Sequence, residues 1–72
     1  MIVTADMASI VWRITVTEGE RVQAGQQLLI LESMKMEIPV LAPAPGTVVD
    51  IPVAEGDVID AGDILVRVER NR

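Results

Sequence analysis

A single lysine provides the only side-chain amine in this 72-residue sequence, because the other five basic residues are arginines. Lys35 lies near the middle of the chain, in the run Glu32-Ser33-Met34-Lys35-Met36-Glu37. Arginine stays protonated under ordinary conditions, whereas a lysine amine becomes a nucleophile once an enzyme removes its proton. Lys35 is therefore the residue predicted to take part in covalent chemistry.

The rest of the composition excludes most other kinds of site. There is no histidine and no cysteine, so Ser-His and Cys-His pairs, the usual zinc-ligand sets and disulfides are excluded. A net charge of −5 disfavours nucleic acid and anionic membranes as partners, because an acidic surface repels phosphate groups. The sequence contains neither a membrane-spanning run of about 20 apolar residues nor the basic start of a signal peptide. We therefore expect a cytoplasmic protein.

The apolar residues indicate a β protein. Half of the sequence is hydrophobic, and Trp12 is the only aromatic residue among many valines, isoleucines, leucines and alanines. Branched aliphatic side chains fit pleated sheets better than helices. A chain of this length holds one hydrophobic core, so residues 1–72 are predicted to form one domain with an aliphatic core.

The two halves of the sequence repeat each other at an offset of 37 residues. Two half-units must pack on each other, since solenoids need about three repeats or more to bury their faces. This favours a pseudo-twofold sandwich or flattened barrel. The matched pairs are Val11 and Val48, Ile14 and Ile51, Val16 and Val53, Glu18-Gly19 and Glu55-Gly56, Val22 and Ile59, Ala24-Gly25 and Ala61-Gly62, Leu28 and Leu65, Leu31 and Val68, and Glu32 and Glu69.

Each half is predicted to run strand, turn, short strand, turn, strand. Residues 10–17 alternate with a period of two, as in a half-buried strand, with Ile10, Trp12, Ile14 and Val16 on its apolar face. A short strand is expected at residues 21–23, and residues 28–31 are typical of a strand buried on both faces. Pro52 falls within the first strand of the second half, which places it at an edge or a bulge. The proline-rich residues 39–45 are interpreted as an extended passage.

Lys35 lies between the two repeats, where one strand ends and the next must begin, so it is predicted at a hairpin tip. Tight hairpins favour Asn-Gly or Asp-Gly, yet the candidate turn residues are Met34 and Lys35. Function is the better explanation for this choice, because flexible methionines suit a surface that several partners bind. In the alternative, Met34 and Met36 continue the face of Ile30 and Ile38 inward and Lys35 is an ordinary solvated residue.

The segment Glu32-Ser33-Met34-Lys35-Met36 resembles the Glu-Ala-Met-Lys-Met motif of biotinyl domains in biotin-dependent carboxylases. The duplication and the stretch of residues 42–48 resemble that family as well, so the likeness covers nearly the whole chain. It implies a flattened β-barrel or barrel-sandwich hybrid of two four-stranded antiparallel sheets with internal pseudo-twofold symmetry. Ser33 replaces the usual alanine, and Ser9 stands where a glycine matching Gly46 is expected.

The resemblance implies that Lys35 is the covalent attachment point of biotin. Biotin protein ligase would activate biotin as an adenylate, and the Lys35 amine would attack it to form an amide. The arm would then carry CO2 between a biotin carboxylase and a carboxyltransferase, so the chain is expected to be a carrier, simplest as a monomer, and not an enzyme. The flanking residues would serve recognition: Glu32, Ser33, Met34, Met36 and Glu37. In the alternative, the two glutamates are ordinary solvated strand ends.

Two other functions compete with the biotin carrier. A lipoyl carrier has the same fold and a lysine at the same hairpin, but lipoyl domains typically flank it with Asp and Ala. The flanking methionines therefore favour biotin. Lipoate is kept as the alternative cofactor, either in place of biotin or accepted by the same domain as well as biotin. A non-covalent barrel-sandwich adaptor needs no modified lysine, and it would have no reason to keep Lys35 between two methionines.

Overall fold

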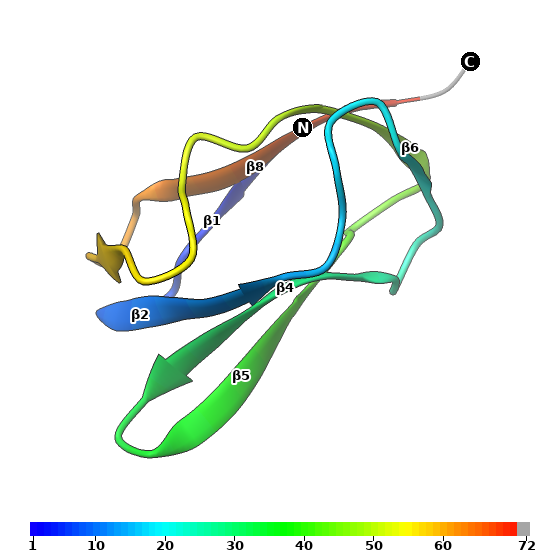
Figure 1. The fold of residues 1–72 in the computed structure, drawn as a ribbon. Coiled ribbons are helices and arrows are strands. Elements are labelled where there is room, and N and C mark those ends of the chain that lie inside the picture. Colours follow the sequence, from blue (N-terminus) through cyan, green and yellow to red (C-terminus); the bar gives the residue numbers. More distant parts are fainter. Residues whose placement is uncertain (71–72) are drawn as a thin grey trace.

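The computed structural model describes residues 1–70, and within this range the chain forms eight strands and no helix (Figure 1). They make two four-stranded antiparallel sheets with the orders β1-β8-β6-β3 and β5-β4-β2-β7, as the family resemblance implies. The strands are β1 (Ile2–Thr4), β2 (Ser9–Ile14), β3 (Arg21–Val22), β4 (Gln27–Ser33), β5 (Met36–Leu41), β6 (Gly46–Asp50), β7 (Val58–Ile59) and β8 (Ile64–Arg70).

The sequence repeat is a structural repeat. Adding 37 residues to the first half converts β1, β2, β3 and β4 into β5, β6, β7 and β8, and so converts one sheet order into the other. The pairing registers follow the same rule, since Val3 pairs with Val66 as Val40 pairs with Leu29. This confirms the predicted pseudo-twofold symmetry at the level of individual residue pairs.

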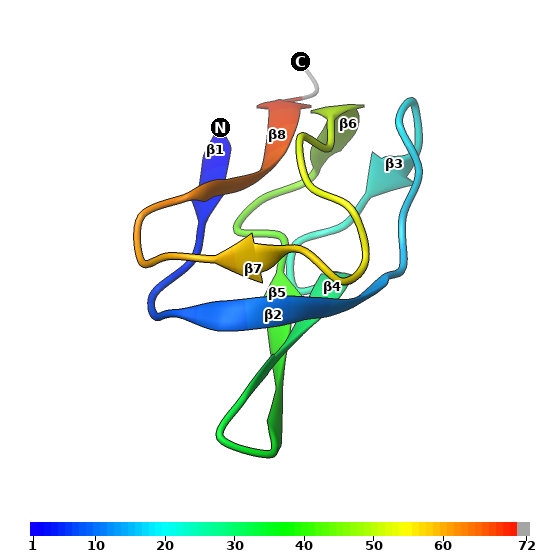
Figure 2. The ribbon, with the colours of Figure 1, turned by 60° about the vertical axis from the view of Figure 1, so that its left-hand side comes forward.

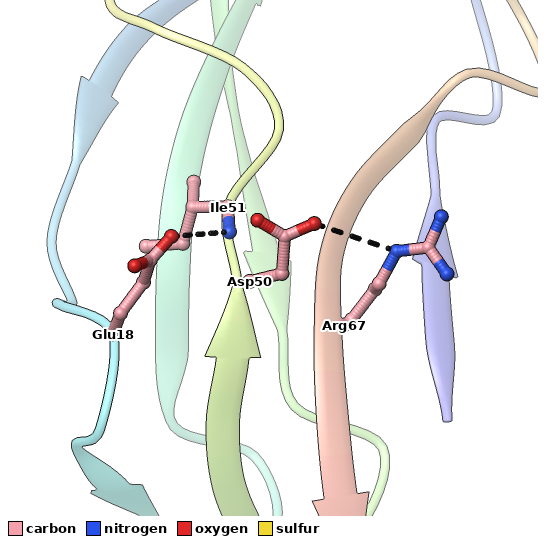
Figure 3. A network of polar contacts seen from close by, with 4 residues as sticks. All are labelled: Glu18, Asp50, Ile51 and Arg67. Atoms are coloured by element: carbon pink, nitrogen blue, oxygen red, sulfur yellow. Dashed lines mark hydrogen bonds and ion pairs between the residues drawn. The ribbon is translucent and has the colours of Figure 1, made fainter.

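The repeated Glu-Gly pairs tie the two halves together. Gly19 and Gly56 adopt positive φ angles of 90° and 94°, which glycine reaches without the steric cost that a Cβ imposes. The carboxylate of Glu18 accepts a hydrogen bond from the backbone N–H of Ile51 at 3.3 Å, drawn in Figure 3. The symmetric Glu55 accepts one from Ile14 N–H at 3.0 Å. Each half therefore has a turn glutamate whose carboxylate accepts a backbone hydrogen bond from the other half.

The core between the sheets is aliphatic, as predicted. Leu28, Leu29 and Leu31 of β4 are buried and Ile30 is half-buried, so this strand is covered on most of both faces. Neighbouring Leu28 and Leu29 are both buried because the β4–β5 register shifts between Gln27 and Leu29. A bulge of this kind lets consecutive side chains depart from strict alternation.

A second bulge makes the predicted alternation of residues 10–17 wrong in part. Val11 is buried, whereas Ile10 and Trp12, which share the predicted apolar face, are 46% and 41% exposed. The β2–β4 register shifts between Val11 and Arg13, so the alternation changes phase. Beyond the bulge Val16 is buried. Ile10 and Trp12 therefore point outward, away from the core.

The prolines also differ in part from expectation. Pro52 is not in a strand, because β6 ends at Asp50. Pro39 lies within β5, which is an edge strand, where a residue without an N–H is tolerated. Only the first part of residues 39–45 is extended, since β5 ends at Leu41 and bends follow.

Ser9 and Gly46 open the symmetric strands β2 and β6. A Cβ on Gly46 would overlap the backbone carbonyl oxygen of Glu69, so the second half requires glycine there. Ser9 is buried, and its hydroxyl donates a hydrogen bond to the carbonyl oxygen of Met7 at 3.2 Å. The first half therefore has room for a side chain where the second half has none.

Candidate functional site

Met34 and Lys35 form a two-residue turn between β4 and β5, closed by the pairing of Ser33 with Met36. Their φ angles are 51° and 64°, and they are the only non-glycine residues with positive φ among those described. A two-residue hairpin with both central residues at positive φ is the type I′ turn that matches strand twist. Left-handed backbone costs roughly 1–2 kcal/mol for each non-glycine residue. Lys35 is thus at a hairpin tip, as predicted, in a conformation that local preference does not favour.

The side chains at this tip face solvent. Met34 is 92% exposed and Met36 is 66% exposed, and Lys35 is exposed as well. The alternative in which the methionines continue the core inward is therefore wrong, because the hairpin extends beyond the sandwich (Figures 1 and 2). Within residues 1–70 the structure gives Lys35 no hydrogen bond or ion pair, which leaves its amine accessible from outside.

Glu32 and Glu37 are directly opposed across the hairpin, and both are exposed. Like charges at opposed positions destabilise a strand pair. The ion pair found among the described residues, between Arg67 and Asp50 at 3.5 Å, lies on the other sheet (Figure 3). The glutamates therefore carry a local electrostatic cost without a compensating cation.

A contact that the sequence did not reveal braces the hairpin at its base. The hydroxyl of Ser33 donates a hydrogen bond to the backbone carbonyl oxygen of Ala8, at 3.2 Å and 25 residues away. Ala8 lies in the loop between β1 and β2. The replacement of alanine by Ser33 thus adds a bond between the hairpin and this loop.

The pseudo-twofold axis places the chain ends far from Lys35. The equivalents of β4 and β5 in the other half are β8 and β1, which carry the termini. Figure 2 shows the N-terminus and the end of β8 at one end of the described structure and the β4–β5 hairpin at the other. The N-terminal amine donates a hydrogen bond to the carbonyl oxygen of Val68, so it lies away from the tip and is already engaged.

A hollow of about 250 Å³ lies beside the hairpin base and does not include the tip. Its lining comes from β1, the loop that follows it, and residues of β4 and β5, with Leu31 and Ile38 on the hairpin side. Residues 33–37 do not line it. The site at Lys35 is thus a projecting arm and not a pocket, an arrangement that suits a group carried to other active sites.

The family model for biotin/lipoyl domains, described as "Biotin-requiring enzyme", matches residues 1–68. The chain belongs to this family. It is 39% identical over 71 residues to the biotin/lipoyl attachment protein of Bacillus subtilis, covering 99% of this chain and 97% of that one. It is 48% identical over 63 residues to the biotinylated protein TB7.3 homolog of Mycobacterium leprae, covering 88% and 89% of the two chains.

Two solved structures that match the chain are larger proteins that contain a similar domain. A single-chain, multi-domain long-chain acyl-CoA carboxylase matches 100% of this chain with a TM-score of 0.93 and 33% identity, over 7% of its own length. The urea carboxylase of Kluyveromyces lactis matches 96% of this chain with a TM-score of 0.90 and 29% identity, over 6% of its own length. These matches confirm the predicted fold.

Membership in the family also confirms the predicted carrier role. The chain is a biotin-attachment domain that acts as a carrier and is not itself catalytic, and biotin is its covalent cofactor. The biotin carrier is supported over the lipoyl carrier. Among residues 1–70 no helix is long and apolar enough to cross a membrane.

Proposed function

We propose that Lys35 is the residue that receives biotin, through an amide between its Nζ and the biotin carboxyl group. The observation that carries this proposal is the turn itself: the only lysine of the sequence lies at φ 64° in an exposed hairpin tip. An Asn-Gly turn would close this hairpin with less strain. The stability of the fold therefore does not explain a solvent-facing Met-Lys turn.

The residues beside Lys35 present it to the modifying enzyme. Met34 and Met36 offer flexible apolar side chains on either side of the amine. Glu32 and Glu37 supply negative charge two to three residues away, which would be neutralised by basic groups on the ligase. Ser33 fixes the hairpin base through its bond to Ala8.

The scaffold and the arm have separate tasks in this function. When attached, biotin supplies a ureido nitrogen that takes up and releases CO2. The long β4–β5 pairing, from Gln27 with Leu41 to Ser33 with Met36, holds Lys35 away from the body of the domain. Tethering raises the local concentration of the carried group at each active site that the arm reaches. Those sites are a biotin carboxylase and a carboxyltransferase.

Intact-mass analysis after incubation with a biotin protein ligase, biotin and ATP tests this proposal. The expected result is one biotinyl adduct on the wild-type chain and none on Lys35→Arg, which keeps the positive charge. An adduct on the arginine variant would contradict the assignment to Lys35.

Lipoate is a second candidate cofactor, because one relative of nearly equal length is named a biotin/lipoyl attachment protein. The same assay with a lipoyl ligase distinguishes the two groups by mass.

We further propose that the single domain spans residues 1–72, and that it acts in the cytoplasm as a monomer.

A further inference from the structure

The outer face of the sheet that carries the hairpin has an apolar patch that the core does not use. We call the following residues the apolar patch: Ile10, Trp12, Ile30, Pro39 and Val58. Val58 pairs with Ile10, and Ile30 pairs with Pro39. Paired residues share a face of the sheet. Val58 is 79% exposed, so the patch is open to solvent.

The internal repeat shows that the fold does not need this patch. The equivalent positions on the outer face of the other sheet, found by the offset of 37, are Thr47, Val49, Ile2, Arg67 and Arg21, against Ile10, Trp12, Pro39, Ile30 and Val58. Arg67 there pairs with Asp50 (Figure 3). Three of these five positions are polar or charged, although the two sheets share their strand order and registers. The apolar side chains therefore call for an explanation outside the fold, and contiguous exposed apolar surface is typical of a protein-binding site.

The distance from Lys35 indicates which partner would cover the patch. A strand advances roughly 3.3 Å per residue and neighbouring strands lie about 4.8 Å apart. Ile10 pairs with Glu32, three residues before Lys35, and so lies roughly 10–12 Å from the tip. An interface of about 800 Å² on each partner has a radius of roughly 16 Å. An enzyme centred on the turn would therefore cover Ile10.

Only the enzyme that modifies the bare amine must approach that closely. The unmodified lysine has a stem of four carbons, so the active site of that enzyme must come to the turn itself. A carboxylase meets an arm lengthened by the whole biotinyl chain, which lets it stay farther from the sheet. The patch thus fits the ligase better than it fits the later partners.

The charges around the patch specify the chemistry of the covering surface. Glu32 and Glu37 stand in the same row of paired residues as Ile10 and Val58, and they separate Ile30 and Pro39 from the turn that carries Lys35. Arg13 is opposite Ile30 on the same face, and its guanidinium lies 5.1 Å from the centre of the Trp12 ring, within the range of a cation–π contact. A matching surface is apolar opposite Ile10 and Trp12 and basic opposite the two glutamates.

We infer that the apolar patch is the docking surface for the biotin protein ligase, which contacts it while the hairpin tip occupies the ligase active site. The inference rests on the proposed function of Lys35. It adds a second contact region on the outer face of β2, β4, β5 and β7, outside the motif around the lysine.

The repeat itself supplies the test substitutions. Ile10→Thr and Val58→Arg, combined in one variant, replace each residue by the one that the other half carries at the equivalent position. The matched control, Val49→Thr with Arg21→Val, alters the outer face of the other sheet. Steady-state biotinylation by the ligase gives KM and kcat for each domain, and urea unfolding verifies that each one is folded.

The double variant is expected to raise KM for the domain at least tenfold with kcat within twofold, and the control is expected to leave both unchanged. A KM within twofold of wild type for the folded double variant would overturn the inference. So would wild-type dimers, seen by sedimentation, that the double variant abolishes, because the patch would then bind a second copy. Failure of the proposed function is distinguishable, since the wild-type domain itself would then remain unmodified at Lys35.

Discussion

Glu32 and Glu37 lie directly opposite each other on the outer face of the β4–β5 hairpin, and no cation of the described chain is paired with either of them. Sheets place opposite charges at such positions when stability alone matters. This pair lies at the base of the turn that presents Lys35. The electrostatic repulsion between Glu32 and Glu37 therefore occurs at the site that an enzyme must recognise.

Neutralising one member of this pair should stabilise the domain and weaken recognition. Glu37→Gln removes the repulsion and is expected to raise the free energy of unfolding by roughly 0.2–1 kcal/mol in urea denaturation at low salt. The KM of the ligase for the domain should rise. Glu69→Gln, at the position equivalent to Glu32, is the control. If it matches Glu37→Gln in both measurements, the opposed pair has no special role.

The backbone strain of the Met34-Lys35 turn should be measurable as a loss in the free energy of unfolding. Lys35→Gly is expected to raise the free energy of unfolding by about 1 kcal/mol, because glycine adopts φ 64° without a Cβ clash. Lys35→Ala keeps the Cβ and should give little or no gain, which separates backbone strain from the loss of the lysine charge. Equal midpoints in urea for the two variants would argue against strain at this position.

The bonds between the halves predict matched losses of stability. Glu18→Gln and Glu55→Gln each weaken a charge-assisted hydrogen bond to the backbone of the other half. Because these sites are exposed, each change should cost about 1 kcal/mol or less. The losses should be similar and close to additive. A large loss for one and none for the other would show that the symmetry does not extend to energetics.

Gly46 and Ser9 should respond differently to the same substitution. Gly46→Ala places a Cβ against the Glu69 carbonyl, and overpacking of this kind costs roughly 1–3 kcal/mol. Ser9→Ala loses one hydrogen bond to Met7 and should cost about 1 kcal/mol or less. Thermal unfolding of the two variants compares them directly, and equal costs would contradict the close approach at Gly46.

The repeat made most of the fold predictable. Matched residues such as Val11 and Val48 occupy equivalent core positions, and Lys35 falls at the hairpin because the first repeat ends there. The strand ends were harder to predict from the sequence, because bulges near Arg13 and Asp50 shift the register. Periodicity cannot reveal a bulge, and it therefore assigned Ile10 and Trp12 to the wrong face.

Contacts between distant segments could not be predicted from the sequence either. The bond from Ser33 to Ala8 joins the end of β4 to a loop 25 residues away in the sequence, and neither residue type signals a partner. The repeat of Glu18-Gly19 as Glu55-Gly56 was visible, but the glycine explained it well enough as a turn. Only the packing of the halves shows that each carboxylate bonds the opposite half.

Locating the modification on the protein isolated from its native host tests most directly whether Lys35 carries biotin. Proteolysis and tandem mass spectrometry should place a biotinyl group on the Nζ of Lys35 and on no other residue. Isolated chains that carry their adduct elsewhere, or that carry none while the host's ligase is active, would show that Lys35 is not the attachment point.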